Sequence, residues 1–194
     1  MSDNSSKIIL DLCGGTGSWS KPYATAGYDV RVITLPDYDV RAFEPPQAVY
    51  GILAAPPCTH FTNSGAQYWK AKDADGRTLA DTQIITHCLR IIAMAAPSFW
   101  AMENPTGRFV RWMGKPKMVF NPCDYGDPYT KRTCLWGRFN EPIMSHVAPE
   151  FVLAPNGDRY SPVNWRTGGG SAKAKELRAI TPPGFAQAFF KANS

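Results

Sequence analysis

Short apolar runs that end in polar or small residues recur through the first two thirds of the chain. Such runs are typical of strands in a sheet that is covered on both faces. They predict strands over residues 7–12, 29–35, 48–55 and 98–102, and a shorter one over residues 134–136. Segments with helical spacing alternate with these runs, which indicates the α/β class.

Three helices are expected between and after these strands. The clearest covers residues 79–95, with Thr78 as its N-cap. A shorter helix is expected over residues 18–26, where it ends at a glycine. The last helix is expected over residues 182–191, with Thr181 as its cap and prolines in its first turn.

The order of these elements predicts a Rossmann-like α/β fold, with a mainly parallel sheet and helices on both faces. Residues 137–177 are rich in Pro and Gly and show little periodicity, so we expect an irregular insert there. A chain of 194 residues and 21.4 kDa has the size of one domain, which we place at residues 1–194.

Composition and charge exclude several classes of protein. Hydrophobic residues make up 44% and charged residues 19%, which is an ordinary globular balance. No apolar run approaches the ~20 residues of a membrane span, and the N-terminus is polar, so we expect a cytoplasmic protein with no membrane partner. The net charge of +5 suits a polyanionic partner such as nucleic acid without requiring one.

The chain has five cysteines, at positions 13, 58, 88, 123 and 134. The number is odd, the spacings are wide, and no two of them form a C-x-x-C pair. We therefore expect free thiols in a reducing compartment, with no disulfide framework and no metal site.

Polar motifs follow three of the predicted strands. They are a glycine turn after Asp11, a thiol at Cys58, and the pair Glu103 and Asn104. Ligands of open α/β sheets bind beyond the carboxyl ends of the strands. Each motif alone could be an ordinary loop, but the three together predict one cleft.

The glycine turn lacks the spacing of a dinucleotide fingerprint, because Ser20 stands where a glycine would be needed. It also lacks the lysine of a phosphate loop. A turn of this kind suits a nucleoside-like cofactor. Asp37 and Asp39 stand about 20 residues after the turn, where an acid often binds a ribose hydroxyl, although both could be simple turn residues.

Two prolines stiffen the chain before Cys58, which makes this thiol a candidate nucleophile. A Cys/His hydrolase using His60 is disfavoured, since residues two apart on a loop do not naturally face each other. Glu103 ends an apolar run, so desolvation should raise its pKa and make it a proton donor. The alternative is a simple ion pair between Glu103 and Arg108 or Arg111.

These motifs resemble those of the DNA cytosine carbon-5 methyltransferases, which use S-adenosylmethionine. The resemblance covers roughly residues 7–136, with a weaker match at residues 180–191. Four blocks carry it in the family's order: DLCGGTG at residues 11–17, APPCTHFTNSG at residues 55–65, MENP at residues 102–105 and DYGDPYTKRT at residues 124–133. It implies the Rossmann-like methyltransferase fold and methyl transfer to DNA, with no metal.

The resemblance also implies a role for each matched residue. Cys58 would add to carbon 6 of cytosine, Glu103 would bind ring nitrogen 3, and Arg132 would hold the base oxygen or the sugar-phosphate. Asn104, Thr62 and Lys131 would contact the substrate. Contacts with S-adenosylmethionine would come from Asp11, Leu12, Gly15, Gly17, Asp37, Asp39 and Pro57.

The chain departs from the family's pattern at several positions. Thr59 replaces the Gln of the Pro-Cys-Gln pattern, and Thr130 and Cys134 leave only Arg132 matched in the Gln-x-Arg-x-Arg block. Residues 137–177 stand where the family places a target-recognition domain. Single-stranded nucleic acid, RNA or a pyrimidine nucleotide therefore stay open as substrates, as does a non-catalytic nucleic-acid-binding module.

A basic stretch could contact phosphates, or could simply be a solvated face. Its members are Arg108, Arg111, Lys115, Lys117, Lys131 and Arg138. A compact enzyme of this kind would suit a small genome such as a phage's, and its place would then be the host cytoplasm. The oligomeric state and the target sequence are not indicated.

Overall fold

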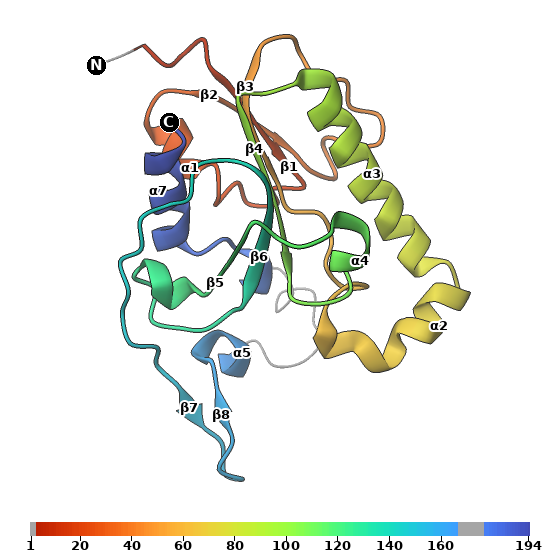
Figure 1. The fold of residues 1–194 in the computed structure, drawn as a ribbon, viewed down its shortest axis with the longest axis vertical. Helices are drawn as coiled ribbons and strands as arrows, with labels where there is room; N and C mark the ends of the chain where they lie inside the picture. The colour runs from red at the N-terminus through yellow and green to blue at the C-terminus, as the bar shows by residue number, and fades with distance from the viewer. Residues whose placement is uncertain (1–2, 167–176) are drawn as a thin grey trace.

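The computed structural model describes residues 3–166 and 177–194. Its centre is a six-stranded sheet of order β2-β1-β3-β4-β6-β5 (Figure 1). The strands are β1 (Ile8–Leu12), β2 (Asp29–Ile33), β3 (Val49–Ala54), β4 (Phe99–Pro105), β5 (Met118–Phe120) and β6 (Thr133–Arg138). The first four are parallel, β6 runs antiparallel to β4, and β5 runs antiparallel to β6.

Helices cover both faces of this sheet (Figure 1). On one face, Ile85 and Ile91 of α3 (Arg77–Ala95) join a buried cluster with Leu10 of β1. On the other face, α1 (Lys21–Thr25) and α7 (Pro183–Ala192) bury Tyr23 and Phe189 against Ile9 and Phe99, among others. The predicted Rossmann-like α/β architecture is therefore confirmed.

The strand β4 is longer than the sequence predicts. It runs on to Pro105 because residues 103–105 pair with Thr133–Leu135 of β6. Glu103 and Asn104 thus lie within a strand rather than after it. The short strand β5 was not predicted, since its three residues carry too little periodicity.

Both predicted N-caps are wrong, whereas Gly27, predicted to end the first helix, follows the C-cap Ala26 of α1 with a positive φ of 82°. Gly76, in the left-handed region at φ 79°, stands at the N-cap of α3, so Thr78 lies inside the helix. Pro182 occupies the N-cap of α7, and the Thr181 backbone N–H donates to Ser18 Oγ instead.

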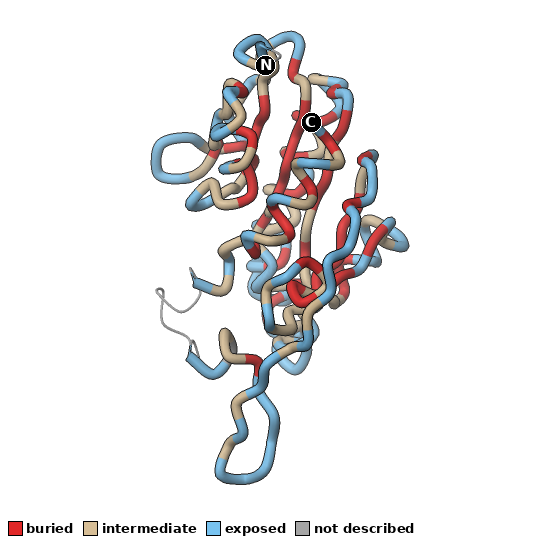
Figure 2. Tube along the Cα trace, turned by 90° about the vertical axis from the view of Figure 1, so that its left-hand side faces the viewer, coloured by how far each residue is buried: buried red, intermediate tan, exposed pale blue. Residues whose placement is uncertain are grey.

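The region 137–177 is not wholly irregular. It holds a hairpin of β7 (Val152–Leu153) and β8 (Arg159–Tyr160), followed by α5 (Pro162–Arg166). The hairpin projects from the body of the protein and is largely exposed (Figures 1 and 2). Residues 167–176 of this predicted insert lie outside the described residues.

Four further short helical segments connect the main elements. They are η1 (Asn63–Tyr68), α2 (Trp69–Ala74), α4 (Val110–Met113) and η2 (Pro122–Tyr125). Among all described helices, none has the length and apolar character that would let it cross a membrane.

Candidate functional site

The strand order defines where a ligand would bind. The neighbours of β1 are β2 on one side and β3 on the other, so the chain changes direction across the sheet at β1. In open α/β folds the crevice beyond the carboxyl ends of two such strands is the usual ligand site. The glycine turn follows β1, Cys58 follows β3, and Glu103 lies on the next strand, β4. The three motifs are therefore brought to neighbouring strands.

Asp11 lies beneath the glycine turn. Its side chain is fully buried, and one carboxylate oxygen accepts a hydrogen bond from Ser20 Oγ at 2.6 Å. The other oxygen is buried with no hydrogen-bond partner among the described residues. Burial raises the pKa of this carboxyl to about 6. A Cβ added at Gly14 would lie 2.3 Å from Asp11 Cγ, so only glycine can cover the carboxyl here.

The outer side of the turn is open. Gly15 is exposed with φ +54°, and no atom lies within 4 Å of the position that its Cβ would take. Gly17 also has a positive φ, of +68°. A glycine backbone with free space beside it fits the close approach of a nucleoside-like cofactor. Leu12 is fully buried, so only its backbone could take part.

The two acids after β2 differ in their surroundings. Asp39 pairs with Arg41 at 2.5 Å and accepts its backbone N–H, and these bonds lower the pKa of the Asp39 carboxyl to about 2. Asp37 is exposed in the same turn. Asp37 is therefore the acid better placed to accept a hydroxyl from a ligand.

The loop that carries Cys58 is held by its backbone carbonyls. Three carbonyls accept hydrogen bonds from side chains of other elements: Pro56 from Asn104 at 3.2 Å, Thr59 from Lys72 at 2.8 Å and His60 from Arg108 at 2.8 Å. The Cys58 carbonyl itself accepts the Phe61 N–H at 2.9 Å. Anchors on both sides of Cys58 fix the direction in which the thiol points.

Arg108 connects this loop to the helices beside it. The residue is only 5% exposed, and its guanidinium donates to Asp73 and Thr78, each at 2.8 Å. It also lies 4.8 Å from the ring centre of Trp69. The alternative ion pair between Glu103 and Arg108 is thereby excluded, because the guanidinium is engaged elsewhere.

The segment after Asn104 also approaches the loop closely. The Arg108 N–H donates to the Phe61 carbonyl at 2.8 Å. A Cβ added at Gly107 would lie 1.9 Å from that carbonyl oxygen, so a side chain cannot be placed there. Thr62 forms a bridge to Gly107, and its hydroxyl lies 3.2 Å from the Ser64 hydroxyl.

The charges around Cys58 act in opposite directions. Cys58 is the exposed one of the five cysteines, all of which are described. Although the residue is exposed, desolvation of the thiol by the surrounding protein and the nearby Glu103 raise its pKa to about 11, while Lys131 acts to lower it. Burial also raises the pKa of Glu103, against the effect of Lys131. The site thus favours a protonated carboxyl and supplies one cation for a thiolate.

The other predicted site residues lie at different depths. Asn104 is fully buried, and its described hydrogen bond holds the nucleophile loop. Pro57 is half-buried, whereas Arg132 is exposed and its charge acts on Cys134. The His60 ring is engaged through Nδ1 by Asp81 at 2.5 Å.

Only part of the predicted basic stretch is free to meet a phosphate. Arg108 is buried, Lys117 donates to the Phe139 carbonyl, and Arg138 donates to the Pro97 carbonyl. Arg111 and Lys115 are exposed. The phosphate-contacting role expected for the whole stretch is therefore wrong for Arg108.

Lys72 and Arg108 are the supporting residues that the sequence did not reveal in this role. Their partners are carbonyls 13 and 48 residues away in the chain. No local pattern marks such contacts, and charged side chains are usually expected in solvent. These contacts can be recognised only in the folded structure, where distant segments lie side by side.

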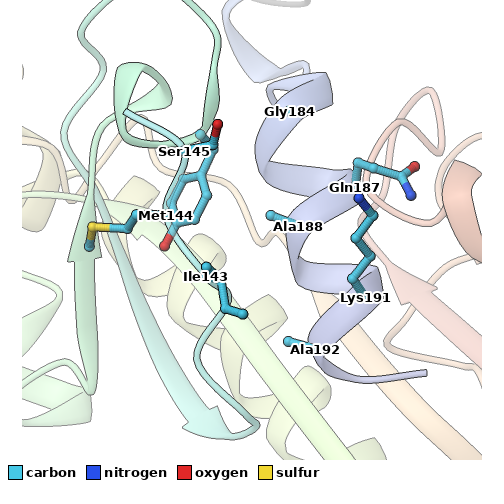
Figure 3. Close-up of a pocket in the computed structure, with 9 residues that line it drawn as sticks. Ile143, Met144, Ser145, Gly184, Gln187, Ala188, Lys191 and Ala192 are labelled. Carbon is cyan, nitrogen blue, oxygen red and sulfur yellow. The ribbon is translucent and has the colours of Figure 1, made fainter. Parts of the chain in front are cut away.

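Two hollows lie elsewhere on the described part of the protein. A groove of about 510 Å³ separates residues 143–145 from α7 and is lined by Tyr125, Met144 and Lys191, among others (Figure 3). A second hollow of about 400 Å³ lies beside Arg108, Arg111 and Trp112. Cys58 and Glu103 line neither of them.

Comparisons with known proteins add a limited context. No protein-family model matches the sequence, and no curated protein matches it either. One similar solved structure is a candidate DNA modification methyltransferase encoded within a prophage (E. coli), at 20% identity and TM-score 0.48, covering 69% of this chain and 47% of that one. Another is the methyltransferase EhMeth of Entamoeba histolytica, at 13% identity and TM-score 0.47, covering 75% of this chain and 58% of that one.

The chain thus spans about half the length of the solved structures it matches. The fold assignment rests on the strand order and on the two helical layers described above.

Proposed function

We propose that the protein transfers a methyl group from S-adenosylmethionine to carbon 5 of cytosine in DNA, through a covalent adduct of Cys58. The observation that carries this proposal is the electrostatic coupling of an exposed thiol, in the loop after β3, to a carboxyl of raised pKa on the neighbouring strand β4. An open glycine turn follows β1, the other neighbour of β3. The four sequence blocks that resemble cytosine carbon-5 methyltransferases support the same chemistry. A binding module would need neither the thiol nor the carboxyl.

The first step makes carbon 5 nucleophilic. The Cys58 thiolate adds to carbon 6 of the ring, so that an S–C bond forms and the electrons of the 5,6 double bond move toward carbon 5 and the ring nitrogen. Glu103, in its protonated form, donates to ring nitrogen 3 and stabilises this charge. Desolvation and Glu103 raise the pKa of the Cys58 thiol, and Lys131 is the nearby cation that opposes this rise and so favours the thiolate.

The later steps restore the aromatic ring. S-adenosylmethionine supplies a methyl group on a positively charged sulfur, which leaves as a neutral thioether. Carbon 5 then carries both the methyl group and its original proton. Loss of that proton to a base re-forms the double bond and expels Cys58 as a thiolate, while the proton on nitrogen 3 returns to Glu103.

The residues around the glycine turn would hold the cofactor. Gly15 and Gly17 offer an open backbone, and Asp37 offers an exposed carboxylate for a ribose hydroxyl. Asp11 supports the turn from below rather than presenting its oxygens to solvent. These features fit a nucleoside-like molecule with no phosphate chain.

The proposal is tested by measuring the mass of nucleosides after incubation of DNA with isotopically labelled S-adenosylmethionine. We expect labelled 5-methylcytosine, and we expect Cys58→Ala to form none while still binding the cofactor. Glu103→Gln should fall by about 100-fold or more, since an amide cannot supply the proton. Thr59→Ala, at an exposed neighbour, is the matched control. Full activity in Cys58→Ala would contradict the proposal.

The nucleic-acid form of the substrate is a separate part of the same test. Parallel reactions with duplex DNA, single-stranded DNA, RNA and dCMP distinguish the alternatives that share this chemistry. The described part of the insert holds the two-residue strands of the hairpin β7–β8 and the five-residue helix α5, where the resembled family has a target-recognition domain. Methylation of dCMP alone would assign the enzyme to free nucleotides rather than to DNA.

A further inference from the structure

Three side chains that commonly bind metal ions meet on the side of the protein that carries α7. Cys123 and Asp124 belong to η2, and His146 comes from the segment that follows β6. One ligand atom from each residue lies within 4.8 Å of the other two. The neighbouring residues Tyr125 and Ser145 line the groove in Figure 3, whereas Cys58 and Glu103 do not line it.

The backbone fixes this meeting of side chains. The Ser145 N–H donates to the Asp124 carbonyl at 2.9 Å, and the Val147 N–H donates to the Cys123 carbonyl at 2.8 Å. These two bonds flank His146 on both sides. The imidazole is therefore held opposite η2 before any ligand binds.

The spacing of the cluster suits coordination better than direct hydrogen bonding. Asp124 Oδ1 and His146 Nδ1 are 3.4 Å apart, whereas the pair His60 and Asp81 is 2.5 Å apart. Two ligands that each bind zinc at about 2.0 Å in a tetrahedral site are about 3.3 Å from each other. The Asp124–His146 separation matches that edge.

Asp124 is also oriented as metal-binding carboxylates are. Its second oxygen, Oδ2, accepts the Asn121 backbone N–H at 2.7 Å. That bond leaves Oδ1 directed toward His146. Hydrogen bonds of this kind to the outer atom of a ligand hold the coordinating side chain in place at known metal sites.

We propose that Cys123, Asp124 and His146 bind a zinc ion, with water as the fourth ligand. A thiolate, an imidazole and a carboxylate are together suited to zinc rather than to magnesium or calcium, which prefer oxygen ligands alone. The two negative ligands balance the charge of the ion. The ion would fasten residues 143–147 to η2, next to α7.

The sequence argued against a metal because it contains no C-x-x-C pair. The C-x-x-C pattern does not detect this cluster, since two of its ligands are adjacent in sequence and the third comes from a segment beyond β6. The cluster shares no residue with the proposed active site, so the proposal is independent of the proposed methyl transfer. The test therefore needs neither cofactor nor DNA.

The experiment titrates cobalt(II) into the purified full chain after treatment with a chelator. A cysteine thiolate bound to cobalt gives a charge-transfer band in the near ultraviolet, and competition with zinc should remove it. The titration is made in the Cys58→Ala background, so that the exposed thiol cannot contribute. We expect one equivalent of metal and a band at saturation.

Variants then assign the ligands. Cys123→Ser should abolish the band, and His146→Ala should weaken binding by at least about 10-fold. His87→Ala, which removes a histidine outside the cluster, should change neither the band nor the affinity for the metal. Circular dichroism of each variant shows whether it is folded. The proposal is overturned if folded protein gives no band, or if the band survives Cys123→Ser.

Discussion

At the scale of single residues, burial decides the protonation state of the groups that would do chemistry. The apolar run before Glu103 predicts a raised pKa, and the structure confirms it, because burial is the largest cause. The sequence does not predict the raised pKa of Cys58, since that rise comes from desolvation of the thiol and from the charge of Glu103, against the effect of Lys131. The sequence shows the groups but not the charges that face them.

The reactivity of Cys58 toward an alkylating reagent should report these charges. Alkylation needs the thiolate, so its rate should rise with pH toward the pKa of about 11. Glu103→Gln removes a negative charge and should lower this midpoint. Lys131→Met removes a positive charge and should raise it, whereas Arg132→Met, its matched control, should leave it nearly unchanged. The rate is measured by mass spectrometry of the Cys58 peptide.

The result that contradicts this assignment is a midpoint that moves with Arg132→Met and not with Lys131→Met. That outcome would place the wrong cation beside the thiol. It would also favour the role of Arg132 that the family resemblance implies.

Asp11 should make folding stability depend on pH. Its folded pKa is about 6 against an ordinary value of 3.8 for an aspartate, so the folded state binds more protons between these two values. Stability is therefore lost as the pH rises through this window, by up to roughly 3 kcal/mol. Asp11→Asn has no titrating carboxyl at this position. The melting temperature of the variant minus that of the native protein should therefore be more positive at pH 7 than at pH 4. A difference that does not vary with pH would contradict the burial argument.

At the scale of elements, the nucleophile loop is the feature that the rest of the protein supports. Pro56 and Pro57 predict a stiff entry to Cys58, and the end of β3 at Ala54 agrees with that prediction. The rest of the support comes from Lys72, Arg108 and Asn104, through carbonyl contacts that no sequence pattern encodes.

Arg108→Met should loosen this loop while leaving the sheet intact. The variant removes the donor to the His60 carbonyl and leaves Asp73 without its partner. We expect a loss of about 1–3 kcal/mol in stability. We also expect faster hydrogen exchange across residues 58–76. The matched control is Arg111→Met, since Arg111 is an exposed neighbour that also lies over Trp69. This variant should change neither the stability nor the rate of hydrogen exchange.

Hydrogen exchange that stays slow across residues 58–76 in Arg108→Met would show that the loop does not depend on this side chain.

The helices show how much of an element the sequence pattern can predict. The range of α3 is predicted to within two residues at its start, but its cap is Gly76 because the chain turns there with a positive φ. Thr78 instead binds Arg108, a partner that sequence spacing cannot show.

At the scale of the whole molecule, the alternation of strands and helices was enough to predict the layered architecture. It was not enough to predict that β6 runs antiparallel to β4, since the sequence of a short apolar strand does not indicate its direction in the sheet. The hairpin β7–β8 was missed because each strand has only two residues. The proposed site follows from the architecture, because the neighbouring strands β1, β3 and β4 carry or precede the glycine turn, Cys58 and Glu103, which are far apart in sequence.

Under the proposed function, the basic residues should not contribute equally to DNA binding. Arg111 and Lys115 are exposed, whereas Lys117 and Arg138 already donate to backbone carbonyls. Arg111→Ala and Lys115→Ala should each weaken binding and reduce the salt slope by about 1. Lys117→Ala and Arg138→Ala should leave the slope nearly unchanged. Fluorescence anisotropy over a range of salt concentrations measures both quantities, and equal slopes in all four variants would contradict this division.

The central claim is that Cys58 bonds to carbon 6 of the target base. An oligonucleotide with 5-fluorocytosine tests it most directly, because carbon 5 then has no proton to lose and the adduct cannot break down. After incubation with S-adenosylmethionine, mass spectrometry of the denatured, digested protein should find the modified base on the peptide that contains Cys58. Labelled 5-methylcytosine in ordinary DNA, with no adduct at Cys58 in the fluorinated oligonucleotide, would contradict the covalent mechanism.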